Sequence, residues 1–235
     1  MRVLAIDTST EIGSVAVRVD GVLRVDEGAP PRTHHGEVLF GHIASVLDAA
    51  KIGLGDIDLF AVGIGPGSFT GVRIGLATAK GLAFAQGKPL VGVPSIDAMG
   101  AAVPAPAFSV VAMDAFKGEV FAAVYRREGD ECAALLAPFH GTPDGARSRI
   151  AEALRDGSSA VRSSYCGAGI RKYPNLVPEG AITLATEFDA PRAGIVATLA
   201  EARFGTEGPS DIHTLEPLYI RGSDATLPSI PLKTD

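Results

Sequence analysis

Tryptophan is absent from this chain of 235 residues, and cysteine occurs only as Cys132 and Cys166. The two cysteines form no C-x-x-C pair and have no zinc-site spacing, so we predict two free thiols in a reducing compartment. With a net charge of −6, the chain also lacks the basic excess of a free-standing nucleic-acid binder. Contact with RNA is therefore expected only through a larger assembly.

Long apolar runs are missing as well. No stretch of about 18 apolar residues indicates a membrane span, and the apolar start from Met1 to Asp7 is too short for a signal peptide. We therefore expect a cytoplasmic protein. An apolar content of 46% and a charged content of 20% are typical of a globular protein, here with a core of small aliphatic side chains.

The five histidines lack the spacing that a metal site requires. On a helix, His35 and His42 would lie about 10 Å apart, too far to share one ion. There is no H-E-x-x-H motif, no G-x-S-x-G motif and no recognisable Ser-His-Asp set. The residues alone predict no metal ligands and no catalytic residues.

Two halves of the chain follow a similar pattern. The first half predicts strands at 3–6, 14–19, 22–25, 59–64 and 90–93, and helices at 34–50, 70–86 and 95–102. The second half repeats a strand ending in aspartate at 108–114, a strand at 120–125 and a strand with Gly-x-Gly at 164–169, with helices at 146–154 and 191–204. This repetition predicts two related α/β lobes, residues 1–103 and 104–221, followed by a tail at 222–235.

Polar residues at two strand ends are candidates for binding an anion. Asp7, Thr8 and Ser9 end the first strand, and a carboxylate there can hold water or a metal against phosphates, or simply cap the turn. The turn Gly65-Pro66-Gly67-Ser68 precedes a helix, whose N-terminus favours anions. It lacks the lysine of a P-loop, and Pro66 removes a donor, so a purely structural turn is equally compatible.

The helix predicted at 70–86 carries small residues in two rows. Gly71, Gly75, Ala79 and Ala83 form one row, and Ala77, Gly81 and Ala85 form the other. Each glycine inside a helix costs roughly 1 kcal/mol relative to alanine, which favours a neighbouring backbone that comes very close. That neighbour is either the first helix of the same lobe or a helix of another chain.

These motifs resemble the TsaB (YeaZ) family of bacterial tRNA-modification proteins. The resemblance covers nearly the whole chain and is carried by residues 4–10, 32–34, 65–75 and 92–95, with weaker matches at 114–120, 167–169 and 217–221. The run GPGSFTGVR at 65–73 is its most specific part. The resemblance implies a two-lobed, duplicated α/β fold of the actin/Hsp70/sugar-kinase (RNase H-like) type.

The resemblance also implies a role in forming threonylcarbamoyladenosine beside the anticodon of tRNA. Family members are non-catalytic subunits that pair with the catalytic, metal- and nucleotide-binding TsaD. The ATPase TsaE joins the complex, and tRNA is contacted only through the complex. Some members also form homodimers through the surface that docks TsaD. No cofactor is required by this interpretation, although weak binding of ATP or ADP is compatible with it.

Residues for two sites follow from this interpretation. The docking surface is expected on the helices 34–50 and 70–86, at His34, Leu39, Ile43, Thr70, Gly71, Arg73, Ile74, Gly75, Thr78, Ala79 and Leu82, with Lys80 as a further polar contact. A vestigial nucleotide cleft is expected at Asp7, Thr8, Ser9, Gly65, Gly67, Ser68 and Asp114. On this hypothesis Gly75→Leu stays folded and loses the partner.

Two positions depart from the family pattern, and one rival function stays open. Phe40 stands where the family often has proline, and Phe116 stands where it often has arginine. The first changes the shape of the docking surface, and the second removes a cation. The rival function is a nucleotide-dependent phosphotransferase or ATPase that uses Asp7, Thr8 and the cleft between the lobes.

Overall fold

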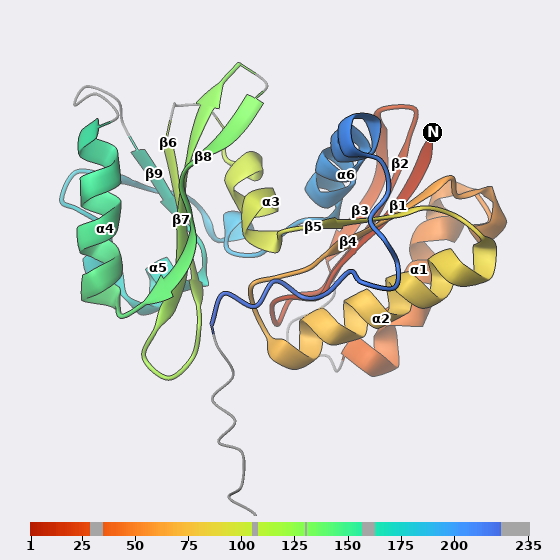
Figure 1. Cartoon of the computed structure of the whole chain (residues 1–235), viewed down its shortest axis with the longest axis horizontal. Coiled ribbons are helices and arrows are strands. Elements are labelled where there is room, and N and C mark those ends of the chain that lie inside the picture. Colours follow the sequence, from red (N-terminus) through yellow and green to blue (C-terminus); the bar gives the residue numbers. More distant parts are fainter. Residues whose placement is uncertain (29–34, 105–107, 130, 157–162, 222–235) are drawn as a thin grey trace, which may run out of the picture.

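The computed structural model describes residues 1–28, 35–104, 108–129, 131–156 and 163–221, which form two lobes lying side by side (Figure 1). In the described part of the first lobe, five strands form one sheet in the order β3-β2-β1-β4-β5. Their bounds are β1 Arg2–Asp7, β2 Ser14–Val19, β3 Val22–Gly28, β4 Leu59–Gly63 and β5 Leu90–Val93.

The second sheet repeats the first. Its order is β10-β9-β6-β7-β8, with β6 Phe108–Asp114, β7 Val120–Glu128, β8 Glu131–Gly141, β9 Ser163–Cys166 and β10 Ile182–Thr183. The central strand β1 pairs antiparallel with β2 and parallel with β4. In the same way, the central strand β6 pairs antiparallel with β7 and parallel with β9. The predicted duplication is confirmed. Strands β8 and β10 were not predicted, because β8 is rich in alanine and contains Pro138, and β10 is two residues long.

Helices α1 (His35–Ala50) and α2 (Phe69–Gln86) cover one face of the first sheet. Alternate residues of β1 and β2, such as Leu4, Ile6 and Val15, point to this face and pack against apolar side chains of both helices. Ser68 caps the N-terminus of helix α2, because its Oγ accepts a hydrogen bond from Gly71 N. Gly87, in the left-handed conformation, caps the C-terminus. The small 3₁₀-helix η1 (Leu54–Asp56) leads into β4.

The helix that follows each sheet packs on the opposite lobe. Helix α3 (Ser95–Ala102) follows β5, and its Ile96 and Met99 pack on the second sheet. Helix α6 (Ala193–Glu207) packs on the free face of the first sheet, where its Ala197 and Ala200 meet β1 and β4. Figure 1 shows α3 and α6 between the two sheets. This differs from the predicted second lobe at 104–221, because α6 completes the core of the first lobe.

Helix α4 (Pro143–Asp156) covers the outer face of the second sheet. Helix α5 (Ala168–Lys172) and the 3₁₀-helices η2 (Pro174–Leu176) and η3 (Thr186–Phe188) lie between β9 and α6. The helix predicted at 146–154 corresponds to α4, and the helix predicted at 191–204 corresponds to α6. Both are confirmed, with boundaries that differ by a few residues.

After α6 the chain returns along the first lobe and crosses to the second. We call residues 208–221 the C-terminal strap. Ser210 N donates to Leu90 O at 2.8 Å, and Leu218 N donates to Ile64 O at 2.7 Å. Arg221 then reaches Ala115 O of the second lobe at 3.3 Å. The strap therefore ties the two lobes together, while the predicted tail at 222–235 lies outside the described residues.

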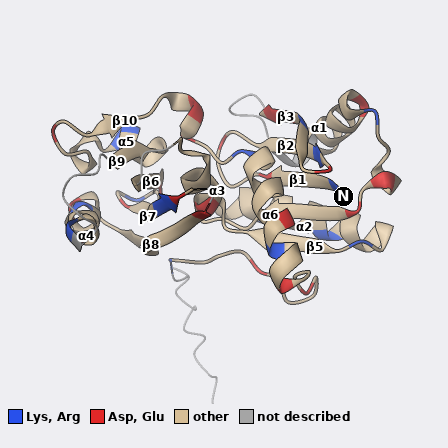
Figure 2. Cartoon of the chain, turned by 90° about the horizontal axis from the view of Figure 1, so that it is seen from above, with Lys and Arg blue, Asp and Glu red and all other residues tan. Residues whose placement is uncertain are grey.

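Charged residues of both signs are found on both lobes (Figure 2). Figure 2 shows Lys and Arg interleaved with Asp and Glu over both lobes. Among the helices that the structure describes, none is both long and apolar enough to cross a membrane.

Candidate functional site

Asp7, the aspartate at the end of β1, is fully buried. Its Oδ1 accepts hydrogen bonds from the backbone N and the Oγ of Ser9, and its Oδ2 accepts one from Ser95 Oγ at 2.6 Å. Ser95 in turn accepts a hydrogen bond from Gly65 N at 3.0 Å. A Cβ at Gly63 would lie 1.8 Å from Asp7 Oδ2, so the carboxylate is sealed in on that side as well. The carboxylate joins β1, the turn after β4 and the start of α3.

Thr8 and the turn before α2 are packed against each other. Thr8 Oγ1 donates to Gly71 O at 2.7 Å, and Ser68 N donates to Ser9 O at 2.7 Å. At Gly67, where φ is +157, a Cβ would lie 2.1 Å from Ser9 O. The glycine turn therefore exists to let the start of α2 approach the end of β1 within the same chain.

These contacts correct the prediction of a nucleotide cleft in the first lobe. The polar groups of Asp7, Thr8 and Ser9 are directed to one another and to the turn around Gly65 and Ser68, where no phosphate can approach them. Six of the seven residues expected in that cleft, all except Asp114, belong to this packed junction. The structure gives no support to a phosphotransferase that uses Asp7 and Thr8.

Asp114, the counterpart of Asp7 in the second lobe, also has other partners. Its Oδ2 accepts a hydrogen bond from Lys172 Nζ at 2.7 Å, and its Oδ1 accepts one from Phe116 N at 3.0 Å. The hydrogen bond to Asp114 raises the pKa of Lys172. Asp114 therefore holds the loop after β6 to α5, which corrects its assignment to the nucleotide cleft.

The first row of small residues in α2 faces the sheet of its own lobe. Gly71, Gly75, Ala79 and Ala83 are all buried. A Cβ at Gly71 would lie 2.1 Å from Thr8 O, and one at Gly75 would lie 2.3 Å from Thr8 Oγ1. The close neighbour that the glycines predicted is thus β1 of the same chain, and Gly71, Gly75 and Ala79 are not available to a partner.

Other predicted docking residues are distributed over both sides of the helices. Leu39 and Ile43 are buried in the core, and Ile74 and Leu82 are partly buried against it. Thr70 and Arg73 are exposed, and Thr78 is partly exposed. His34 lies outside the described residues. The docking surface therefore cannot consist of the predicted set as a whole.

The second row of small residues in α2 is the exposed one. Ala77, Gly81 and Ala85 are exposed, and beside them Phe84 is 75% exposed. On α1, Phe40 is 61% exposed. We call the following set the outer face of α1 and α2: Val38, Phe40, Gly41, Ala44 and Ser45 of α1, and Arg73, Ala77, Gly81, Phe84 and Ala85 of α2. The sequence identified both rows of α2 without deciding which of them is exposed.

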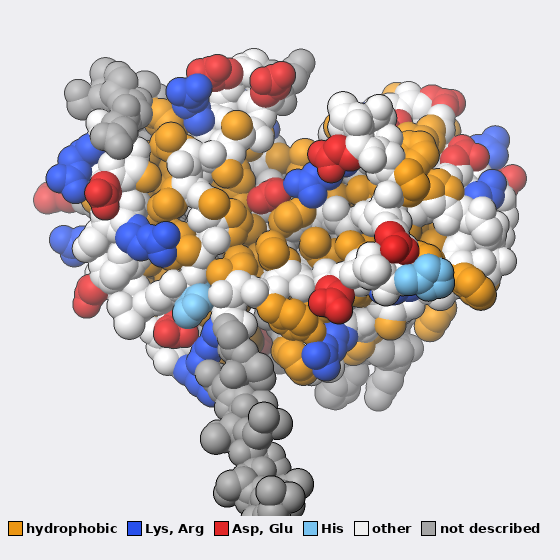
Figure 3. All heavy atoms as spheres, viewed as in Figure 1, with side chains coloured by type: hydrophobic (Ala, Val, Ile, Leu, Met, Phe, Trp, Pro, Cys, Tyr) orange, Lys and Arg blue, Asp and Glu red, His pale blue; other side chains and the backbone are white. Residues whose placement is uncertain are grey.

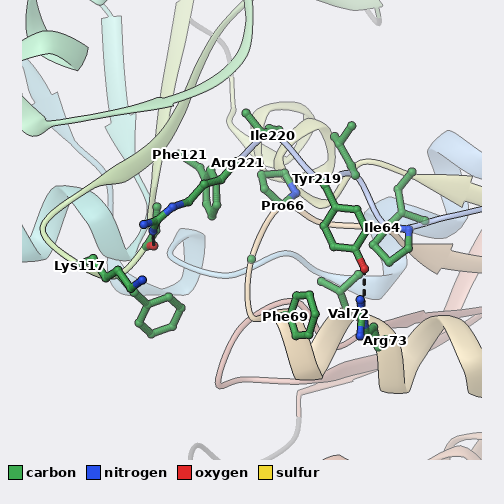
Figure 4. A pocket seen from close by; sticks show the side chains of 15 residues that line it. Ile64, Pro66, Phe69, Val72, Arg73, Lys117, Phe121, Tyr219, Ile220 and Arg221 are labelled. Atoms are coloured by element: carbon green, nitrogen blue, oxygen red, sulfur yellow. Dashed lines mark hydrogen bonds between the residues drawn. The ribbon is translucent and has the colours of Figure 1, made fainter. Parts of the chain in front are cut away.

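A cavity of about 500 Å³ opens between the lobes at the N-terminal end of α2. Its walls come from the turn and first residues of α2, the loop after β6, and the strap (Figure 4). Phe69, Arg73 and Tyr219 lie on one side, with Lys117 and Arg221 on the other. The residues expected to bind a nucleotide do not line it, apart from Gly67.

Metal ligands are not gathered anywhere in the described residues. No group of three or more His, Cys, Asp or Glu residues there could hold an ion. In the first lobe, His42 Nε2 lies 3.6 Å from Glu27 Oε2. In the second lobe, His140 Nδ1 lies 3.8 Å from Glu119 Oε2. Cys132 and Cys166 are both unpaired, and burial raises the pKa of the Cys166 thiol to about 12.

Comparison with known proteins relates the chain to tRNA-modification proteins. Residues 28–216 match the model of the family described as TsaD, tRNA N6-adenosine threonylcarbamoyltransferase. The chain is 33% identical over 237 residues to the tRNA threonylcarbamoyladenosine biosynthesis protein TsaB of Escherichia coli K12, with 96% of each covered. It is also 38% identical over 113 residues to a tRNA N6-adenosine threonylcarbamoyltransferase of Clostridium botulinum, which covers 41% of this chain and 33% of that protein.

A solved structure agrees with these relatives. YeaZ from Pseudomonas aeruginosa has a TM-score of 0.81 and 26% identity, over 93% of this chain and 99% of that chain. The duplicated sheets and exchanged helices define a two-lobed protein of the actin-type class, here with the aspartate of its first strand sealed inside. Within this class, the chain belongs to the TsaB (YeaZ) family.

Proposed function

We propose that this protein is a non-catalytic subunit in the synthesis of tRNA threonylcarbamoyladenosine, and that it docks a TsaD protein through the outer face of α1 and α2. The observation that carries the proposal is this face, where two neighbouring helices expose small residues and two large aromatic side chains. Its small residues support close helix packing, and its exposed phenylalanines are the type of side chain that anchors an interface.

The similarity to both TsaB and TsaD supports a particular geometry. The family match at 28–216 includes all the described residues of α1 and α2, so a TsaD protein carries a related segment of chain. Two related helix pairs can then meet about a pseudo-two-fold axis, with the same face used on each side. A homodimer through the same face is the competing assembly. An interface of this type buries roughly 1,200–2,000 Å² in total.

The sealed position of Asp7 supports the non-catalytic part of the proposal. A carboxylate that accepts three hydrogen bonds from Ser9 and Ser95 serves the fold. Catalysis then belongs to the TsaD partner, and neither a cofactor nor a metal is part of the role of this chain. A TsaE-like ATPase joins the assembly, and tRNA is met through it.

Co-expression with the TsaD protein of the same organism tests the docking face. Phe84→Ala and Gly81→Leu should remain folded, because Phe84 is exposed and a Cβ at Gly81 meets nothing within 4 Å. We expect each to weaken the complex by roughly 30-fold or more, which corresponds to at least about 2 kcal/mol at an interface centre. The measurement is co-purification followed by titration of the separated proteins.

A matched control lies on the second lobe. Ile182 is exposed at the edge strand β10, and Ile182→Ser should bind the partner as the parent does. If both variants of α2 bind normally, or if the control fails equally, the docking face is misplaced. Calorimetry of the purified chain with ATP and magnesium tests the non-catalytic part, since turnover by the chain alone would contradict it.

A further inference from the structure

The cavity between the lobes is lined by several aromatic side chains, most of which are partly exposed to solvent. Phe69, Phe116 and Tyr219 are each at least half exposed, and all three line it together with the buried Phe121. Exposed aromatic groups gathered at one hollow mark a binding site more often than scattered ones do. At the lower centre of Figure 3, hydrophobic side chains reach the surface beside a Lys or Arg.

Positive charge gathers at the same place, although the chain as a whole is acidic. Arg73, Lys117 and Arg221 line the cavity, and none of the described residues that line it is acidic. Arg221 is paired with Glu119 at 3.5 Å and fixes the end of the strap. Arg73 and Lys117 come from opposite lobes and lie on opposite sides of the cavity (Figure 4).

Arg73 is held in position by its neighbours. Its Nε donates to Tyr219 Oη at 2.9 Å, and its guanidinium carbon lies 3.7 Å from the centre of the Phe69 ring. The guanidinium has five N–H donors, and the described residues accept only the one from Nε. The remaining donors are preorganised for a planar, two-oxygen anion.

The backbone around the cavity argues against a phosphate-rich ligand. The start of α2 is already capped, because Gly71 N donates to Ser68 Oγ and Ser68 N donates to Ser9 O. A polyphosphate needs several such amides, and those of Ser68 and Gly71 are used within the chain. A single carboxylate needs only the remaining donors of one guanidinium.

We propose that the inter-lobe cavity binds an aromatic carboxylate, with its ring among Phe69, Phe116 and Tyr219 and its carboxylate on the guanidinium of Arg73. A volume of about 500 Å³ is within the range that small-molecule sites occupy. Arg73 belongs both to this cavity and to the outer face of α1 and α2, whereas the other residues that line the cavity lie outside that face.

Titration of the full chain with 2-naphthoate tests the proposal. Because the chain has no tryptophan, the fluorescence of the probe can be followed without tryptophan background. We expect one saturable site, and binding about tenfold weaker in Arg73→Met, because this variant loses the charge-assisted contact. The neutral analogue 2-naphthalenemethanol should bind more weakly than the acid.

Two controls separate the cavity from other surfaces. Phe84→Ser removes an exposed aromatic group of the outer face and should bind 2-naphthoate as the parent does, and so should a chain that ends at Arg221. Absence of saturable binding overturns the proposal, as does equal binding of the acid and the neutral analogue. A loss in Phe84→Ser as large as that in Arg73→Met would place the probe on the helices instead. Binding that requires removal of residues 222–235 would assign the cavity to the chain's own end and also overturn it.

Discussion

The same substitution at two positions of α2 should change stability in opposite directions. Gly75 and Gly81 both lie inside this helix, and alanine is better than glycine there by roughly 1 kcal/mol. A Cβ at Gly81 meets nothing within 4 Å. Gly81→Ala should therefore stabilise the protein by about 0.5–1 kcal/mol.

At Gly75 the added methyl group has no room. It would lie 2.3 Å from Oγ1 of Thr8, a side chain that is 1% exposed and donates to Gly71 O at 2.7 Å. Moving this hydroxyl away forfeits a buried hydrogen bond, worth about 1–3 kcal/mol, and overpacking costs about 1–3 kcal/mol more. After subtraction of the helix gain, Gly75→Ala should destabilise the protein by about 1–5 kcal/mol.

Thermal unfolding followed by circular dichroism measures both changes. For a chain of this size, 1 kcal/mol corresponds to roughly 2–4 °C in Tm. We expect Gly81→Ala to raise Tm by a few degrees and Gly75→Ala to lower it by a larger amount. If Gly75→Ala raises Tm as Gly81→Ala does, the assignment of this row to the interior is refuted. By the same reasoning, the bulkier Gly75→Leu should fail to fold. This differs from the expectation from the sequence that it stays folded and loses only its partner.

Two further outcomes follow from buried groups. Asp7→Asn should destabilise the protein by about 1–3 kcal/mol in urea unfolding, because an amide nitrogen would face the hydroxyl donors of Ser9 and Ser95; unchanged stability would show that the carboxylate is not needed at this junction. In thiol labelling at pH 8 followed by mass spectrometry, Cys166 should react far more slowly than the partly exposed Cys132, because burial raises the pKa of Cys166 to about 12. Equal rates would contradict the buried position of Cys166.

The local pattern predicted most of the elements and the duplication. Strands such as 3–6 and 108–114 are continuous apolar runs buried on both faces, and Gly87 ends α2 where the sequence indicates. Edge strands were harder, because β8 pairs along one side only and its residues carry little intrinsic preference. The sequence also could not predict which sheet α6 packs against, since its alanine-rich surface fits either lobe.

The candidate docking face shows the same division. The sequence identified two rows of small residues on α2 and the two helices that carry them, because a spacing of four residues is a local property of a helix. Which row faces β1 and which faces solvent depends on how the helix is rotated on the sheet, and that rotation is decided by contacts such as the one between Thr8 and Gly71.

The sequence by itself therefore determined the two related lobes, their central strands and the family, because these follow from periodicity and short motifs. The tertiary structure decided that Asp7 is sealed, that Gly75 meets β1, and that the strap brings Tyr219 beside Arg73. Each of these joins residues distant in the chain, from 67 positions for Thr8 and Gly75 to 146 for Arg73 and Tyr219. No local preference encodes such a pairing, which forms only when the whole core is packed.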